Sequence, residues 1–151
     1  MKKLILLLNI AAVSAMASLT ACSSQPPIPV TFSDICQKTG ERVVIEGYLR
    51  LPATGTSCKS NRCMLNLISE LQGRVQSITA QVRNTAKPGS GVNAIEPLPE
   101  RFSAQDLRIH ANDGRVVDPN TKLRIAGAVQ KAGGSCELSV DVIEAAAQPA
   151  N

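Results

Sequence analysis

The sequence predicts a small all-β domain that carries one short N-terminal helix and two disulfide bonds. Segments of alternating apolar and polar residues recur between residues 41 and 144, and glycine, proline and Asn-Asp-Gly turn signals separate them. A segment with the features of an export signal precedes the domain. Four of the five cysteines lie within the domain itself. The chain of 151 residues is long enough for one compact domain, so no second domain is expected.

Residues 1–21 have the composition of an export signal. Two lysines directly follow the initial methionine, and the apolar segment behind them is shorter than the roughly 20 residues of a membrane-spanning helix. The segment Leu19–Cys22, LTAC, resembles the lipobox of bacterial lipoproteins. This resemblance implies cleavage before Cys22 and a lipid on that cysteine, which would anchor the protein in a membrane. The alternative is an ordinary signal peptide that leaves Cys22 as a thiol.

The lipobox resemblance also implies a location and an order of segments. Ser23, rather than Asp, follows the cysteine, which favours the outer membrane in a Gram-negative cell, at its periplasmic side or surface. Residues 22–31 then form a tether in which three prolines favour an extended chain. We expect the folded domain to span residues 32–144 and residues 145–151 to form a flexible tail.

The four remaining cysteines allow three disulfide patterns. Cys58 and Cys63 enclose four residues, which suits a turn between two strands, and this pairing leaves Cys36 for Cys136. Closing so long a loop would stabilise the domain by about 3–5 kcal/mol. A zinc site or a redox pair is the competing interpretation, which the lack of Cys-x2-Cys knuckles disfavours.

A helix and a long strand are expected at the start of the domain. Residues 32–40 are predicted to form a short helix that ends at Gly40. Residues 41–51 form the clearest strand, with an apolar face at its odd-numbered positions. Gly47 lies halfway along this strand, and a glycine there marks a bulge or a bend at a barrel corner.

The rest of the domain is expected to consist of strands and turns. Residues 67–83 fit both a helix and a hairpin, and we favour the hairpin because apolar residues alternate at its end and Gly73 would interrupt a helix. Residues 84–99 are rich in proline and glycine and are predicted to form a long irregular loop. Strands are expected at residues 63–68, 75–83, 107–109, 116–117, 122–130 and 135–144.

A resemblance to a known barrel follows from the two ends of the domain. The opening SDICQKTGERVVIEGYL and the closing KLRIAGAVQKAGGSCELSVDVIEAA each place a polar segment beside a strand with a central glycine. This pattern resembles the OB-fold, a five-stranded Greek-key barrel whose first strand is long and bent. The resemblance implies that residues 33–144 form such a barrel. A small β-sandwich with two disulfides is the competing fold.

The composition disfavours an enzyme. The chain has one histidine, three aromatic rings and no tryptophan, which disfavours a histidine-rich metal site or a Ser-His-Asp triad. His110 is predicted to lie exposed in a turn rather than to act as a base, and Glu96, Glu100 and Asp106 show no spacing that pairs two carboxylates. We therefore expect no catalytic residue, no metal and no cofactor.

The charge distribution points to a binding surface. Residues 36–92 carry eight lysines and arginines against three glutamates. Within this basic half, the candidate ligand-binding residues are Tyr48, Arg50, Arg62 and Arg83, because Tyr48 and Arg50 share a strand face where a ring and a guanidinium form a platform.

The sequence thus predicts a membrane-anchored binding or assembly module of the cell envelope. Its partner would be another envelope protein, a small ligand or a glycan. A surface protein that binds single-stranded nucleic acid during DNA uptake or secretion is the alternative, although few aromatic rings are present for stacking on bases. A weak hydrolase that depends on His110 is the least favoured function.

Overall fold

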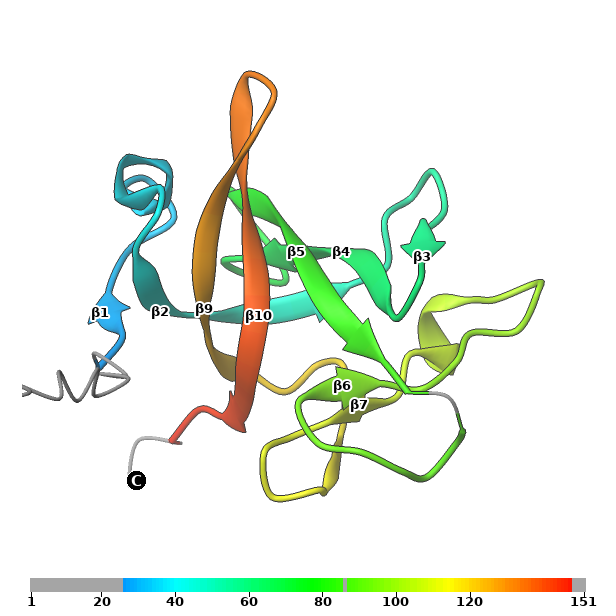
Figure 1. The fold of residues 1–151 in the computed structure, drawn as a ribbon. Coiled ribbons are helices and arrows are strands. Elements are labelled where there is room, and N and C mark those ends of the chain that lie inside the picture. Colours follow the sequence, from blue (N-terminus) through cyan, green and yellow to red (C-terminus); the bar gives the residue numbers. More distant parts are fainter. Residues whose placement is uncertain (1–25, 86, 148–151) are drawn as a thin grey trace, which may run out of the picture.

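The computed structural model of the protein describes residues 26–85 and 87–147 (Figure 1). The predicted signal segment, the lipobox with Cys22 and the end of the predicted tail lie outside the described residues. In the part of the chain that the structure describes, no helix combines the length and the apolar composition needed to cross a membrane.

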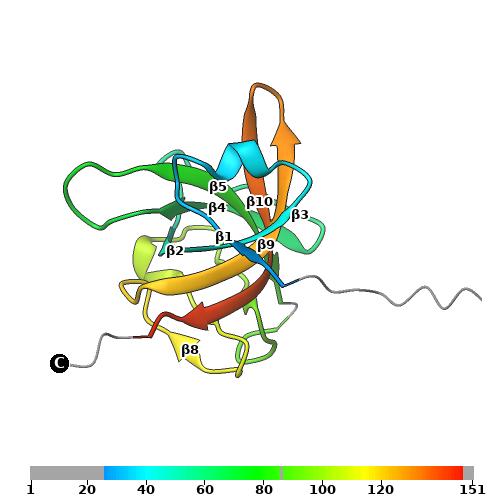
Figure 2. The ribbon, with the colours of Figure 1, turned by 90° about the vertical axis from the view of Figure 1, so that its left-hand side faces the viewer.

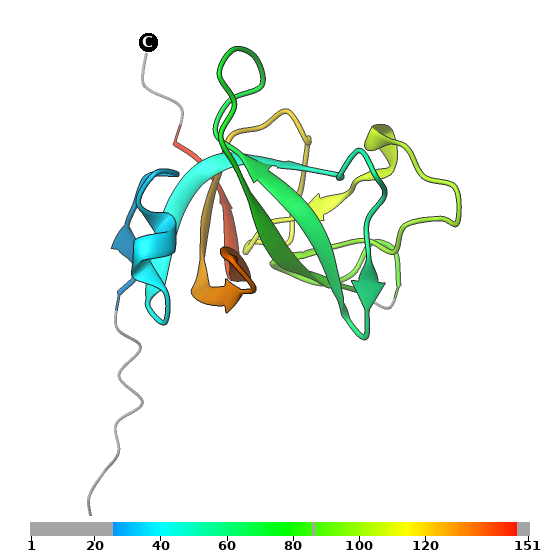
Figure 3. The same ribbon diagram turned by 90° about the horizontal axis from the view of Figure 1, so that it is seen from above.

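Five long strands close into a barrel, which confirms the predicted fold class. They are β2 (Arg42–Arg50), β4 (Arg62–Ile68), β5 (Ser77–Asn84), β9 (Leu123–Ala132) and β10 (Ser135–Ala145). Their order around the barrel is β2, β4, β5, β10, β9 and back to β2 (Figures 1 and 3). The β5–β10 pair is parallel and the other four are antiparallel. The hairpin prediction for residues 67–83 is therefore right.

Smaller elements lie around the barrel. They are the strands β1 (Ile28–Pro29), β3 (Cys58–Lys59), β6 (Ala94–Ile95), β7 (Ile109–His110) and β8 (Val116–Val117), and the 3-10 helices η1 (Ile35–Lys38) and η2 (Ala104–Asp106). The helix predicted over residues 32–40 does not form, and the single turn η1 stands in its place. The amide of Gly40 already donates to the carbonyl oxygen of Val129 at 2.8 Å, so the chain has joined the barrel by then and leaves room for one turn only.

The strands bury one face each in a common core. The fully buried side chains from the barrel include Val43, Leu49, Leu65, Leu67, Val82, Leu123, Ile125, Leu138 and Ile143. Val44 belongs to the opposite face of β2 and is nevertheless buried, because β1 runs parallel to β2 with Pro29 beside it. The N-terminal segment therefore covers part of the outer wall of the barrel.

Gly47 lies at the bend of β2 that the sequence predicts. Up to Gly47 the strand pairs with β9, and from Tyr48 onward it pairs with β4. A Cβ atom on Gly47 would lie 2.5 Å from the carbonyl oxygen of Ile68, which is closer than any side chain tolerates. The bend at which β2 passes from β9 to β4 thus depends on a residue without a Cβ atom.

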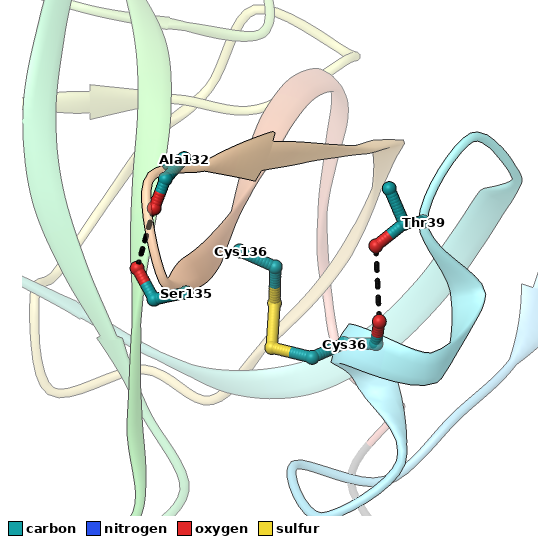
Figure 4. The surroundings of a disulfide bond; sticks show 5 residues. All are labelled: Cys36, Thr39, Ala132, Ser135 and Cys136. Carbon is teal, nitrogen blue, oxygen red and sulfur yellow. Dashed lines mark hydrogen bonds between the residues drawn. A yellow bond between two sulfur atoms is a disulfide. The ribbon is translucent and has the colours of Figure 1, made fainter.

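Both predicted disulfides are present. Cys58–Cys63 joins two residues that are directly opposite each other in the β3–β4 hairpin. Cys36–Cys136 ties η1 to β10, near the tip of the β9–β10 hairpin that projects beyond the barrel (Figures 2 and 4). The covalent links therefore hold the two hairpins and the N-terminal turn at their places on the barrel.

The chain between β5 and β9, residues 85–122, is here called the connection. It closes the end of the barrel opposite to the tip of the β9–β10 hairpin. Three two-residue strands and η2 are the regular structure in its described part. It nevertheless contributes fully buried side chains to the core, namely Ala94, Ile95, Leu107, Ile109 and Ala111. The irregular loop predicted for residues 84–99 is thus interrupted by β6, which pairs with the end of β5.

Candidate functional site

The four predicted ligand-binding residues fall at two places on the barrel. Tyr48 and Arg50 lie at the end of β2, whereas Arg62 and Arg83 are opposite each other on β4 and β5. Arg50 is paired with Asn66, four residues beyond Arg62 on β4, which corresponds to roughly 13 Å along the strand. The structure therefore does not bring all four residues into one site.

The outer face of β4 and β5 is a lattice of side chains in register. Its cross-strand pairs are Arg62–Arg83, Met64–Gln81 and Asn66–Thr79, and β10 adds Ser139 beside Gln81 and Glu137 beside Thr79. A further pair, Ile68–Ser77, continues the face, so Met64 and Ile68 are its apolar members and the other residues present hydrogen-bonding groups. In OB barrels this face and the loop between the first two barrel strands bind ligands.

Three cations stand in one row at the edge of this face. Lys59 of β3 is directly opposite Arg62 of β4, and Arg62 is directly opposite Arg83 of β5. Neighbouring strands are about 4.8 Å apart, so the three backbone positions span about 10 Å. We call Lys59, Arg62 and Arg83 the basic row. Sequence analysis missed Lys59, although the Cys58–Cys63 pairing implies that Lys59 and Arg62 are opposite each other.

No carboxylate in residues 26–85 and 87–147 forms an ion pair with the basic row. Arg62 donates to the carbonyl oxygen of Gln81 at 3.4 Å and to the hydroxyl of Ser139 at 3.2 Å. Arg83 donates in the other direction, to the carbonyl oxygen of Val92 in the connection. Both guanidinium groups thus bind uncharged acceptors, and neither forms an ion pair among the described residues.

A hollow of about 410 Å³ opens beside the row. Its lining consists of Ser57, Lys59, Ser60, Asn61, Arg62, Met64 and Gln81. The Cys58–Cys63 disulfide closes the hairpin that forms one wall, so this wall is fixed before any ligand binds. A small anionic group in this hollow would be next to Lys59 and Arg62.

Tyr48 and Arg50 each line a further hollow, and both hollows adjoin the turn at residues 118–121. Arg50 lines a hollow of about 650 Å³ and Tyr48 one of about 420 Å³, and Asn120 lines both. The guanidinium of Arg50 donates to the carbonyl oxygen of Pro119 at 2.9 Å and to Oδ1 of Asn120 at 2.8 Å. The platform predicted from the sequence is therefore divided by Asn120.

The prediction of an exposed His110 is wrong. His110 is 2% exposed, and its Nε2 lies 2.8 Å from Oε1 of Glu96. The ring is buried because β7 lies between β6 and β8, which the sequence does not reveal. The hydrogen bond with His110, followed by one from the amide of Gly89 at 2.9 Å, lowers the pKa of Glu96. This pair joins the two halves of the connection, with His110 buried and Glu96 partly exposed, so the ring itself is not open to a substrate.

No group of three or more metal-ligating side chains is present among the described residues. No protein-family model and no curated protein matches the chain. Among solved structures, the chain is similar to a protein from Leishmania major Friedlin assigned as an aspartyl-tRNA synthetase. The two share 13% sequence identity with a TM-score of 0.43, over 89% of this chain and 23% of that chain. We base no argument on this similarity.

Proposed function

We propose that this protein is an exported lipoprotein, anchored to the outer membrane through Cys22, whose barrel is a non-catalytic binding module of the cell envelope. Its ligand is an anionic group, on another envelope protein or on a glycan, that binds across the basic row. The observation that carries this proposal is the register of Lys59, Arg62 and Arg83 on neighbouring strands without a carboxylate partner.

The basic row lacks the carboxylate partners that three other cations at the barrel surface have. Arg42 pairs with Asp141 at 2.8 Å, Arg124 with Glu144 at 2.9 Å and Lys122 with Glu46 at 3.2 Å. Like charges directly opposite each other destabilise a strand pair, so a row of three carries a cost that an anion would remove. Carboxylates of the barrel thus neutralise Arg42, Arg124 and Lys122, whereas the three adjacent cations of the basic row have no carboxylate partner among the described residues.

The position of β1 supports an outward-facing site. Ile28 is the sixth residue after Cys22, so the chain reaches at most about 20 Å from a lipid on Cys22 to the barrel wall. Figures 1 and 3 show β1 and β3 on opposite sides of the barrel. A lipid anchor would therefore hold the β1 side near the membrane and turn the β3 side, with the basic row, away from it.

Titration calorimetry with two polyanions tests the binding function. A short oligomer of galacturonic acid and a single-stranded oligonucleotide are titrated at low and moderate salt into the wild type and into Arg62→Gln/Arg83→Gln. The control is Arg74→Gln/Lys131→Gln, which removes two charges away from the row. We expect the carboxylate polymer to bind the wild type and the control, and binding to the row variant to be about tenfold weaker or more.

Three outcomes would lead elsewhere. Equal affinity of the two double variants would exclude the basic row as the site. Absence of binding to any polyanion at low salt would contradict the binding function. Strong binding of the oligonucleotide alone, with affinity that falls steeply with salt, would support the alternative of a nucleic-acid-binding surface protein.

The anchor is tested separately, in cells. We expect the full chain to incorporate radioactive palmitate and to fractionate with the outer membrane, and Cys22→Ala to do neither. An unlabelled wild-type protein in the soluble periplasmic fraction would show an ordinary signal peptide instead. Because the binding titration does not depend on the lipid, either half of the proposal can fail without the other.

A further inference from the structure

A second surface, apart from the basic row, has the features of a docking site. Two neighbouring hollows lie between the end of β2 and the connection and share Asn120 as a lining residue. We call the two hollows together the Tyr48–Arg50 groove. It lies outside the β4–β5 face, and it exists only because the connection packs beside the barrel. The volume of each hollow is within the range of sites that bury a small molecule or a few side chains.

Arg50 is the fixed cation of the groove. Its two hydrogen bonds go to Pro119 and Asn120, which are uncharged, and it forms no ion pair among the residues that the structure describes. Two of the five N–H donors of a guanidinium are then in use, and the planar fork is held in one orientation. The Arg50 side chain therefore loses little further conformational freedom when a carboxylate binds its remaining donors.

Arg108 supplies a second guanidinium at the rim of the larger hollow. One carboxylate, Asp118, also lines this hollow, and its Oδ1 accepts a hydrogen bond from the amide of Asn120 at 2.7 Å. Among the lining residues, two guanidinium groups against one carboxylate leave an excess of one positive charge. Outside the lining, Arg108 also lies near the carboxylates of Asp106 and Glu96 and contributes to lowering their pKa. In the smaller hollow, Lys122 and Glu46 neutralise each other. The excess positive charge of the groove thus lies at its Arg50 end.

The uncharged surface of the groove is mostly aliphatic. Leu107, Val116 and Val117 line the larger hollow, and Val116 is 48% exposed, the largest exposed fraction among the large apolar side chains of the described chain. Tyr48 is the one aromatic residue in either hollow. Tyrosine and arginine beside aliphatic surface are typical of protein interfaces, whereas sugars and bases prefer several aromatic rings.

We propose that the Tyr48–Arg50 groove docks an extended acidic segment of a partner protein. An acidic side chain of the segment binds Arg50 and Arg108, and an apolar side chain packs against Val116 and Tyr48. This proposal does not rest on the function of the basic row, since the two surfaces share no residue.

The composition of the chain supplies a probe for this groove. Tyr48 is the only tyrosine and the chain has no tryptophan, so tyrosine fluorescence of the unlabelled protein reports on the groove itself. The ligands are two blocked hexapeptides, one of alternating leucine and glutamate and one of alternating leucine and glutamine. We expect the glutamate peptide to change the emission with saturation, and the glutamine peptide to bind about tenfold more weakly or not at all.

Two variants locate the charge that the peptide contacts. Arg50→Gln and Arg108→Gln should each weaken binding of the glutamate peptide about tenfold, while Lys131→Gln at the far end of β9 should leave it unchanged. Arg50→Gln also loses the bonds to Pro119 and Asn120, so thermal unfolding is measured alongside. The side chain of Arg108 makes no hydrogen bond in the described structure, so the Arg108→Gln variant keeps the test valid if Arg50→Gln unfolds.

Several results would overturn the proposal. They are equal affinity for the glutamate and glutamine peptides, unchanged binding to a folded Arg108→Gln, or no change of tyrosine emission at millimolar glutamate peptide. A glutamate peptide that Arg62→Gln/Arg83→Gln weakens instead would assign the acidic ligand to the basic row and leave the groove without one.

Discussion

The two ends of the barrel are closed by different kinds of interaction. At one end, Cys36–Cys136 fixes η1 to the β9–β10 hairpin covalently. At the other end, Cys58–Cys63 closes the β3–β4 hairpin beside the connection. The connection itself is held by hydrogen bonds, among them the one between the buried His110 and the partly exposed Glu96. There the amide of Ile143 donates to Oδ1 of Asn93 at 2.7 Å, and its carbonyl oxygen accepts from Asn112 at 2.7 Å. Oxidation therefore secures η1 and the two hairpins, and protonation state influences the connection.

The basic row lies where the hairpin closed by Cys58–Cys63 meets the connection. Lys59 lies in the disulfide-closed hairpin, whereas Arg83 is paired with Ala94 of the connection and donates to Val92. A site assembled from both regions keeps its geometry only if both are in place. Loss of structure in either the hairpin or the connection should therefore weaken anion binding to the row.

The largest effect should come from the long disulfide. Cys36→Ser/Cys136→Ser removes a link across 100 residues, and we expect a loss of about 5 kcal/mol in the free energy of unfolding. Cys58→Ser/Cys63→Ser removes a link across five residues and should cost about 2 kcal/mol. Urea unfolding of both variants measures the difference. Equal losses would contradict the view that Cys36–Cys136 is the main covalent constraint.

The connection is tested next as a part of the core. Ile109 in the connection and Ile125 in the barrel are both fully buried, so replacing either with alanine should cost about 3 kcal/mol. Urea unfolding at neutral pH measures both. A cost for Ile109→Ala well below that of Ile125→Ala would mean that the connection opens independently of the barrel.

Acidification should lower the free energy of unfolding more for the wild type than for Glu96→Gln, which has no carboxylate at this position. The lowered pKa of Glu96 means that its ionised form stabilises the folded state above the ordinary glutamate pKa, and that this contribution is lost as the pH falls through the lowered value. Glu96→Gln should cost about 1–3 kcal/mol near pH 7, because it alters the partner of a buried ring. The difference from the wild type should shrink on acidification.

A matched control separates this pair from surface carboxylates. Asp113 in the same connection also has a lowered pKa, from hydrogen bonds with the backbone and side chain of Arg115, but it is exposed. Asp113→Asn should change the stability far less than Glu96→Gln. Equal pH profiles of the two variants would rule out His110–Glu96 as the main acid-sensitive contact.

The smallest effect concerns repulsion within the basic row. Lys59→Gln removes one of three adjacent cations, and we expect it to leave the protein equally stable or to stabilise it by about 0.2–1 kcal/mol at low salt. Added salt should stabilise the wild type more than the variant, since it screens the same repulsion. Thermal unfolding at two salt concentrations measures this. A clear loss of stability in Lys59→Gln would show that the row is not repulsive.

Local patterns explain why much of the barrel could be predicted. Alternation identifies β2, β9 and β10, Gly47 marks the bend, and four cysteines suffice for both disulfides. The connection gave no such signal, because its strands are two residues long and its His110–Glu96 pair joins residues 14 positions apart. The His110 prediction failed for this reason.

The basic row was hidden for a different reason. Arg62 and Arg83 were candidates as single cations, but their alignment depends on the register of β4 and β5, which a hairpin with an eight-residue loop does not fix in the sequence. Lys59 could have been included, since a Cys58–Cys63 staple sets the register of β3 and β4. Charge patterns become sites only once strand pairing is known.

An NMR titration shows whether the basic row binds anions. Tripolyphosphate is added to the isotope-labelled protein, and the amide shifts of all described residues are followed. We predict saturable changes centred on Lys59, Arg62 and Arg83, which disappear in Arg62→Gln/Arg83→Gln. Changes spread evenly over the surface lysines and arginines, or confined to the Tyr48–Arg50 groove, would contradict anion binding at the basic row.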